Sequence, residues 1–212
     1  MTAATPPRVS AERGHPVFAW VYARLSNGAE TGVVGRHRAP LVGQARGVTV
    51  DIGAGTGANL EHLPPAVTAL HLVEPDPHMR ARLVRRAPEH AVVHAVGGEH
   101  LPLADASVDT VLVTLTLCSV DDPARVAAEI RRVLRPGGQV LVMEHVRSED
   151  PRTERRQREL TPLWRRIGGG CHLDRDAAAT FAAAGFDTAG LRHVVLPGLS
   201  VTRRFLIGAV RS

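Results

Sequence analysis

The sequence predicts an α/β fold in which helices cover both faces of a doubly wound, mostly parallel sheet of seven strands. Two observations predict it: short apolar runs alternate with helical patterns from Val48 onward, and a glycine-rich turn directly follows the first run. Five runs have the length and composition of buried parallel strands: Val48–Ile52, Leu70–Val73, Ala91–Val96, Thr110–Leu115 and Gln139–Met143. We therefore expect a ligand-binding crevice at the carboxyl ends of these strands.

The segments between the runs have helical patterns. Pro77–Arg86 begins with proline at a first-turn position, and Asp122–Leu134 begins with Asp-Pro and ends before Pro136-Gly137-Gly138. The charged stretch Arg147–Arg158, in which arginines alternate with glutamates four residues apart, favours a solvated helix face. Further helices are expected at residues 16–25, 32–45 and 175–184.

The end of the chain predicts the edge of the sheet. Leu191–Leu196 and Arg204–Val210 have strand patterns, and Pro197–Ser200 is short enough to join them as an antiparallel hairpin. The chain has 212 residues, of which 44% are apolar, and this is enough to form a single domain around one hydrophobic core. Within that domain we expect an N-terminal helical appendage, a cofactor-binding core and an acceptor-side segment with the edge hairpin, at residues 1–47, 48–145 and 146–212.

Composition excludes several classes of protein. Aromatic residues make up only 3% of the chain, which leaves few rings for stacking nucleic-acid bases. The start of the chain has no leader pattern, and the longest apolar-rich run, Val111–Val120, is half a membrane span, so we expect no membrane anchor. Cys118 and Cys171 match neither a disulfide framework nor a closely spaced zinc signature. We therefore expect free, buried thiols, no metal and a cytoplasmic location. The abundance of Arg and Ala with no Lys indicates a GC-rich bacterial genome.

The net charge of +5 invites a nucleic-acid interpretation, but the placement of the charges argues against it. Residues 1–47 contain 6 arginines against 2 acidic residues, and residues 146–212 contain 12 against 7, whereas residues 48–120 contain 4 against 8. The first half of the sheet is therefore acidic, and the positive excess lies in the two flanking segments. There it suits an anionic acceptor or a thiolate.

The strongest local signal is the segment from Val48 to Gly57, in which a strand leads directly into glycines. Glycines allow a tight turn and a close approach of the backbone to a ligand, and Glu74 follows at the end of the next strand, where a carboxylate holds a ribose. The loose dinucleotide pattern from Gly53 to Ala58 leaves a nicotinamide cofactor as an alternative. Asp51 would repel a pyrophosphate but suits a cationic amine or sulfonium, and both it and the GxGxG spacing favour S-adenosylmethionine.

From about Val48 to the C-terminus the chain resembles the class I S-adenosylmethionine-dependent methyltransferases. The motifs that carry the resemblance are VDIGAGTG, Glu74-Pro75, Leu101-Pro102-Leu103 with Ser107-Val108-Asp109, and Leu134-Arg135-Pro136-Gly137-Gly138. The resemblance implies a Rossmann-like sheet and S-adenosylmethionine as the methyl donor, with S-adenosylhomocysteine as the product. Gly97 stands where the family has an acid for adenine, so Glu99 or the backbone of Gly98 and Glu99 is expected there instead. The cofactor contacts that we expect are Asp51, Gly53, Ala54, Gly55, Gly57, Glu74, Pro75, Met79, Gly98, Glu99, Leu115 and Thr116.

A narrower resemblance links three segments to the group that contains the alkyl-thiol methyltransferases of animals and is close to ubiquinone-type enzymes. The segments are Thr114–Val120, Met143–Val146 and Gly170–Arg175. The resemblance implies a small thiol as the acceptor. Because thiols ionise readily, thiol methylation needs no strong base, whereas an oxygen or carbon acceptor needs a better one.

Three catalytic candidates are expected on the acceptor side: His145, His172 and Tyr22. His145 follows a strand at its carboxyl end, with a hydrogen-bonded side chain at the sheet rim as the alternative, and His172 is otherwise a surface loop residue. Phe18, Trp20 and Tyr22 give the N-terminal helix an aromatic side that caps the cofactor or packs on the sheet. Solvated arginines are expected at Arg36 and Arg38, and the alternative is that one of them meets the cofactor carboxylate.

The sequence thus predicts a small-molecule methyltransferase that acts on a thiol, in bacterial secondary metabolism or detoxification. The alternative acceptors are a quinone-like carbon, a hydroxyl and a lipid amine. A nucleic-acid-binding or RNA-methylating protein that uses the arginine-rich flanks, and a nicotinamide-dependent dehydrogenase, are the alternatives from other classes.

Overall fold

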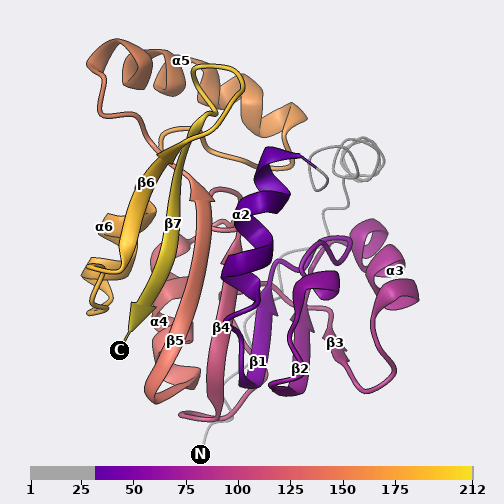
Figure 1. Ribbon diagram of the computed structural model, residues 1–212. Coiled ribbons are helices and arrows are strands. Elements are labelled where there is room, and N and C mark those ends of the chain that lie inside the picture. Colours follow the sequence, from indigo (N-terminus) through magenta and orange to yellow (C-terminus); the bar gives the residue numbers. More distant parts are fainter. Residues whose placement is uncertain (1–31, 212) are drawn as a thin grey trace, which may run out of the picture.

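The computed structural model describes residues 32–211 and confirms the predicted doubly wound sheet. The strands lie in the order β3-β2-β1-β4-β5-β7-β6, in which β1 to β5 are parallel and β7 is antiparallel to both β5 and β6 (Figure 1). Their bounds are β1 (Gly47–Ile52), β2 (Val67–Val73), β3 (Val92–His94), β4 (Val108–Thr114), β5 (Leu134–His145), β6 (Leu191–Val195) and β7 (Arg204–Arg211). The helix expected at 16–25, with Phe18, Trp20 and Tyr22, lies outside the described residues.

The helices of the described residues are α2 (Val33–Val42), the short 3₁₀ turn η1 (Leu60–His62), α3 (Pro77–Arg86), α4 (Pro123–Val133), α5 (Pro151–Ile167) and α6 (Ala177–Ala183). Helices α2, α3, α4 and α6 lie close to their predicted positions, whereas α5 ends later than predicted and the turn η1 was not predicted. Four of them begin after an aspartate whose carboxylate accepts backbone N–H groups of the first turn: Asp76, Asp122, Asp150 and Asp176. Helix α5 extends beyond the predicted charged stretch, and the expected pairs four residues apart are present between Arg155 and Glu159 and between Glu154 and Arg158, both at 2.9 Å.

Three strands differ from the predicted runs by three residues or more. β2 begins three residues before the predicted run, at Val67. β3 is only three residues long and lies at the edge of the sheet, where Val92 is exposed. β5 is longer than expected because it pairs with β4 both before and after a shift in register. Val108 pairs with Leu134 before the shift, and Thr110 pairs with Gln139 after it. The predicted hairpin of β6 and β7 is confirmed. Its strands end at Val195 and begin at Arg204, and the intervening loop contains Pro197–Ser200.

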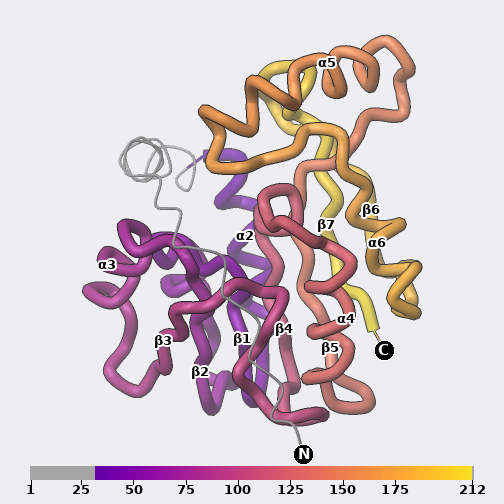
Figure 2. Tube along the Cα trace, turned by 180° about the vertical axis from the view of Figure 1, so that it is seen from behind, coloured from indigo at the N-terminus to yellow at the C-terminus, as the bar shows by residue number. Residues whose placement is uncertain are grey.

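Alternate side chains of each strand enter different cores on the two faces of the sheet. On one face Leu112 and Leu141 pack with Leu41 and Val42 of α2. On the other face Val111, Val113, Val140 and Val142 pack with α4 and α6. Figures 1 and 2, which view the molecule from opposite sides, show α2 on one face and α4 with α6 on the other. This three-layer arrangement fixes the strand ends at which the site is built.

Helix α5 lies beyond the carboxyl end of β5 in both views (Figures 1 and 2). Its apolar residues Leu160, Leu163 and Ile167 are exposed. Within residues 32–211, no helix combines the length and the apolar character needed to cross a membrane.

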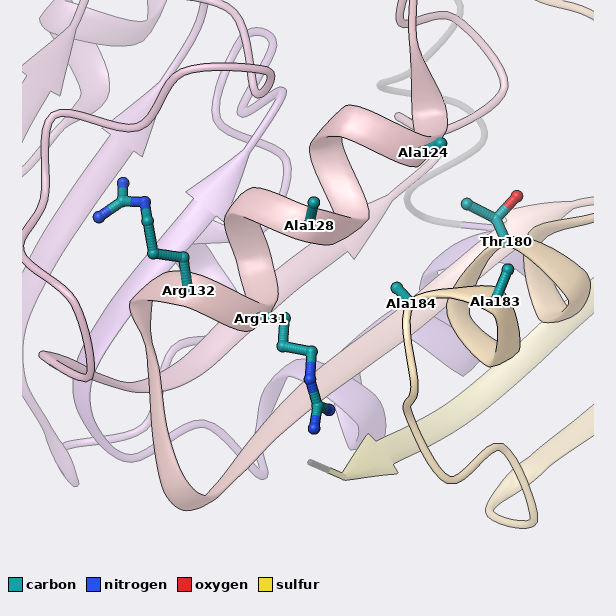
Figure 3. A pocket seen from close by; sticks show the side chains of 7 residues that line it. All are labelled: Ala124, Ala128, Arg131, Arg132, Thr180, Ala183 and Ala184. Carbon is teal, nitrogen blue, oxygen red and sulfur yellow. The ribbon is translucent and has the colours of Figure 1, made fainter.

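A hollow of about 410 Å³ lies between α4 and α6 (Figure 3). Alanines, Thr180 and two arginines line it. Arg131 donates to the backbone oxygen of Gly185, and Arg132 bonds Glu129 and Asp105, so both guanidinium groups are already paired. The described residues that line the hollow include no carboxylate, histidine or cysteine, so we place the candidate site elsewhere.

Candidate active site

The glycine-rich turn leaves β1 at its carboxyl end in a left-handed backbone conformation. Gly53 has φ +68° and Gly55 has φ +58°, and the backbone N–H groups of Gly53 and Ala54 both donate to the carbonyl of Val73 at the end of β2. A Cβ on Gly53 would lie 2.6 Å from the Thr116 side chain, whereas a Cβ on Gly55 would meet nothing nearer than 3.8 Å. Gly53 is therefore required for packing, whereas a Cβ on Gly55 would make only ordinary van der Waals contacts, so there is room for another atom beside Gly55.

Asp51, the penultimate residue of β1, is a buried carboxylate with one oxygen unsatisfied. Its side chain accepts a 2.9 Å hydrogen bond from Nδ2 of Asn59 through Oδ1, while Oδ2 is buried and has no hydrogen-bond partner among the described residues. Burial raises the pKa of Asp51 to about 7, although Asn59 and Arg38 act in the opposite direction. A buried carboxylate with one oxygen unpaired is suited to bind a cation.

Arg38 of α2 contradicts the expectation of a solvated arginine. It is 1% exposed, and its Nη1 donates to Oδ1 of Asn59 at 2.6 Å and to Oγ1 of Thr114 at 3.0 Å. Asn59 in turn bonds Asp51, so Arg38 supports the carboxylate through this polar network and also acts on it directly through its charge. Arg36 is exposed, as expected.

Glu74 lies directly after β2 and holds the glycine turn. Its Oε2 accepts the N–H of Gly55 and its Oε1 accepts the N–H of Asp76, both at 2.8 Å. Burial raises the pKa of Glu74 despite these two hydrogen bonds. Met79 of α3 is buried beside Gly55, whereas Pro75 is exposed. Since each carboxylate oxygen can accept more than one hydrogen bond, Glu74 retains capacity for a ligand hydroxyl.

The residues expected near adenine have other contacts in the structure. Gly98 packs closely against Ile52, where a Cβ would lie 2.7 Å from the isoleucine Cγ2. The Glu99 carboxylate accepts the N–H groups of Asp121 and Asp122 at 3.2 and 3.4 Å, at the start of α4. The adenine-binding role of both residues stays a prediction.

The end of β4 is strained at Leu115, which has φ +60°, a conformation that costs a non-glycine residue about 1–2 kcal/mol. Such strain is retained only where the surroundings enforce it. The next residue, Thr116, donates its hydroxyl to the carbonyl of Ile52 at 2.8 Å and thereby joins β4 to the glycine turn. The structure therefore brings Asp51, the glycine turn, Glu74, Met79 and Thr116 together at one edge of the sheet, as predicted.

Glu144 is a site residue that sequence reasoning missed. It is fully buried, and it accepts the backbone N–H groups of Thr116, Leu117 and Cys118 at 2.5, 3.0 and 3.3 Å. Burial raises the pKa of Glu144 well above its ordinary value. Its carboxylate fixes the turn that follows β4. Its position beside His145 at the end of a strand was the only available signal.

His145 is buried at the end of β5, as predicted, and its ring contacts a thiol. Nε2 lies 2.7 Å from Sγ of Cys171, and Nδ1 has no hydrogen-bond partner within residues 32–211. Cys118 is buried beside them, and its contact with Cys171 together with burial raises the pKa of the Cys118 thiol. The expectation that both cysteines are free and buried is confirmed.

His172 lies on the same side of the site, half-buried after the Gly168–Gly170 turn. Its backbone N–H donates to the carbonyl of Cys118 at 2.7 Å, and its Nδ1 lies 3.2 Å from the same oxygen. Because a carbonyl only accepts, Nδ1 carries the proton and the neutral ring keeps its lone pair on Nε2. Burial and Arg175 lower the pKa of His172, which favours this neutral form. Tyr22, the third candidate, lies outside the described residues.

Comparison with known proteins identifies a domain within the chain. Residues 50–142, which span the glycine turn, Glu74 and β4, match the family described as methyltransferase domain. The match assigns these residues to a methyltransferase domain. A solved methyltransferase structure from Thermotoga maritima has the same fold: the TM-score is 0.62 at 22% identity, over 91% of this chain and 99% of that one.

Two curated proteins that are similar to this chain are named for an activity. Thiol S-methyltransferase TMT1B of Rattus norvegicus is 38% identical over 146 residues, which cover 64% of this chain and 59% of the relative. Thiol S-methyltransferase TMT1A of Homo sapiens is 35% identical over 155 residues, which cover 70% of this chain and 63% of the relative. The aligned part thus spans about three-fifths of the length of these relatives.

The residues at this edge of the sheet are suited to S-adenosylmethionine, the methyl donor that the sequence predicts. The unsatisfied Oδ2 of Asp51 suits the donor's ammonium group, Glu74 has acceptor capacity for ribose hydroxyls, and the space above Gly55 admits a close ligand. A pyrophosphate would instead place like charge beside Asp51.

Replacement of Gly55 by alanine is expected to weaken cofactor binding more than it weakens the fold. The methyl group meets ordinary contacts, so the strain at φ +58° costs about 1 kcal/mol and lowers the melting temperature by about 2–4 °C. The same methyl group occupies the space that the ligand needs, and we expect the affinity for S-adenosylhomocysteine to fall about tenfold, or about 1.4 kcal/mol. Calorimetry and thermal unfolding measure the two effects. Unchanged affinity would show that the ligand does not approach Gly55.

Proposed function

We propose that this protein is an enzyme that transfers a methyl group from S-adenosylmethionine to the sulfur of a small thiol. The observation that carries the proposal is the 38% identity to a relative named thiol S-methyltransferase. Support comes from the site, where His145, Cys118 and His172 meet at the carboxyl ends of β4 and β5 beside Thr116.

When bound, S-adenosylmethionine supplies an electrophilic methyl group on a positively charged sulfur. Asp51 would bind the donor's ammonium group, and Glu74 would bind the ribose. The turn held by Glu144 would align the acceptor beside the donor, because Thr116 connects this turn to the glycine turn. Alignment is the main requirement of an in-line displacement, in which the thiol sulfur forms its bond to carbon as the bond to the sulfonium sulfur breaks.

The acceptor proton has a suitable destination in His172. Nε2 of the neutral ring has the lone pair, because Nδ1 faces the carbonyl of Cys118. His145 is less suited to this role, since its Nε2 already contacts the Cys171 thiol. An ordinary thiol has a pKa near 8.5, so about a few per cent is thiolate at neutral pH, and a weak base such as His172 suffices.

A paired acceptor panel tests the proposal. The protein is incubated with methyl-labelled S-adenosylmethionine and with a small alkyl thiol, an aromatic thiol, and the alcohol, phenol and amine of the same carbon skeletons. We expect labelled thioethers from the thiols and no product from the oxygen and nitrogen analogues. The Asp51→Asn variant is the background control. Turnover of a phenol, quinol or amine with no turnover of any thiol would replace the proposal by the corresponding O-, C- or N-methylation.

A further inference from the structure

The buried cluster of Cys118, His145 and Cys171 has the composition of a metal site. Three segments supply these residues: the turn after β4, the last residue of β5 and the loop after α5. Their ligand atoms, two Sγ atoms and one imidazole nitrogen, all lie within 4.8 Å of one another. Each residue is at most 8% exposed. Two thiolates and an imidazole are a ligand set that zinc takes in proteins.

The backbone around the cluster is held in place from several directions. Glu144 accepts the N–H groups on one side of the Cys118 turn, and Nη1 of Arg175 donates to the carbonyls of Leu117 and Val120 on the other, at 2.5 and 2.7 Å. The N–H of His172 bonds the carbonyl of Cys118 and so fixes the loop that carries Cys171. Such support of ligand positions by neighbouring hydrogen bonds is what a metal site requires.

Charge and spacing agree with a zinc ion. Two thiolates neutralise the charge of the zinc ion, which matters at a place as buried as this cluster. Zinc–sulfur and zinc–nitrogen bonds of about 2.3 and 2.0 Å place tetrahedral ligand atoms about 3.5–3.8 Å apart. The contact of 2.7 Å between His145 Nε2 and Cys171 Sγ would therefore open by about 1 Å on binding.

We propose that Cys118, His145 and Cys171 bind a zinc ion whose fourth ligand is the sulfur of the methyl acceptor. Three protein ligands leave one position of a tetrahedral ion open, as in catalytic zinc sites. Cys118 is two residues beyond Thr116, so the open position lies in the region where the acceptor must meet the donor. The fourth-ligand part rests on the proposed function, whereas the metal site itself does not.

The metal accounts for the activation of the acceptor. A thiol that coordinates zinc would lose its proton to water. The sulfur then forms its bond to the methyl carbon while the sulfonium bond breaks and its electron pair stays with the donor sulfur. The neutral thioether that results is a weaker ligand than a thiolate, so the product can be exchanged for another thiol.

The metal site is tested on the full chain without an activity measurement. Protein freed of metal by chelation is loaded with zinc, and separately with cobalt, and the bound metal is counted. We expect about one metal ion per chain and, with cobalt, the thiolate charge-transfer and intense d–d bands of a four-coordinate ion. Cys118→Ala and Cys171→Ala should lose both signals, and His145→Ala should weaken them. His193→Ala, at an exposed histidine of β6, is the control.

Several outcomes would overturn the metal site. Binding of less than about 0.2 zinc ions per chain would do so, as would equal metal loading in the cysteine variants or a preference for copper over zinc. Absence of titratable thiols in denatured protein prepared without reductant would also do so, because it would indicate a disulfide. Binding of S-adenosylhomocysteine by each variant checks that it is folded.

The fourth ligand is tested by adding the small thiol to the cobalt form. We expect the d–d bands to shift, and the matched alcohol to leave them unchanged. A cobalt spectrum indifferent to thiol would overturn the acceptor part of the proposal, as would full thiol turnover by metal-free protein. A metal site that binds thiol in a protein that methylates no thiol would overturn the proposed function and the acceptor part together, and would leave the metal site itself in place.

Discussion

Replacement of Asp51 by asparagine is expected to weaken cofactor binding by about two orders of magnitude. The carboxylate is buried, and its Oδ2 has no hydrogen-bond partner among the described residues, so it is available to the ammonium group of the ligand. Loss of one partner of a buried charge pair costs about 3 kcal/mol, which corresponds to about a 100-fold loss of affinity. Calorimetric titration with S-adenosylhomocysteine measures it.

The same substitution should leave the free protein intact or stabilise it. Burial raises the pKa of Asp51 from 3.8 to about 7, so the folded state binds this proton more tightly than the unfolded state does. The folded protein therefore loses stability as the pH rises from about 4 to about 7, and the full penalty applies at pH 8. Asparagine carries no charge, so we expect the melting temperature of the variant to exceed that of the wild type at pH 8 and to equal it only at or below about pH 4, where Asp51 is protonated in both the folded and the unfolded state.

Wild-type affinity should depend on pH for the same reason. Binding requires the ionised form of Asp51, and protons compete with the ligand below pH 7, so the affinity should fall about tenfold between pH 8 and pH 6. Asp109→Asn, at the amino end of β4, is the matched control, because that carboxylate bonds Arg135 and the N–H of Val48 far from the glycine turn. A variant that binds normally, or affinity that does not change with pH, would remove Asp51 from the site.

The parts of the fold that follow from local chemistry could be predicted from the sequence. The cap aspartates, the proline at the start of α3 and the glycines after β1 each impose a backbone conformation on their neighbours, and α3 has its predicted bounds. The association of Asp51 with Glu74 could also be predicted, because parallel strands end at the same edge of the sheet.

The missed contacts join residues that only the strand order brings together. Arg38 meets Thr114, 76 positions away, because α2 crosses the face of the sheet over β4 and β5. His145 meets Cys171 across 26 positions, a spacing that resembles no compact metal motif. Burial of an arginine or a glutamate depends on such partners, so residue type alone predicted solvation for Arg38 and gave no role to Glu144.

Glu144 offers the largest expected effect on stability. Leucine in its place would leave the buried N–H groups of Thr116, Leu117 and Cys118 without an acceptor, at about 1–3 kcal/mol for each unsatisfied group. The turn can rearrange to recover part of this, and we expect the free energy of unfolding to fall by about 3–5 kcal/mol and the melting temperature by about 10 °C.

The matched variant Glu144→Gln separates the hydrogen bonds from the shape of the side chain. Its amide oxygen can still accept the two shorter bonds, from Thr116 and Leu117, and only the 3.3 Å bond from Cys118 is lost. We therefore expect the free energy of unfolding to fall by only about 1 kcal/mol. Because Thr116 joins this turn to the glycine turn, the leucine variant should also bind S-adenosylhomocysteine more weakly than the glutamine variant. Equal melting temperatures for the two variants would mean that the carboxylate only fills space. Lower stability of the leucine variant with unchanged cofactor affinity would mean that Glu144 stabilises the fold only and that the turn after β4 does not contribute to cofactor binding.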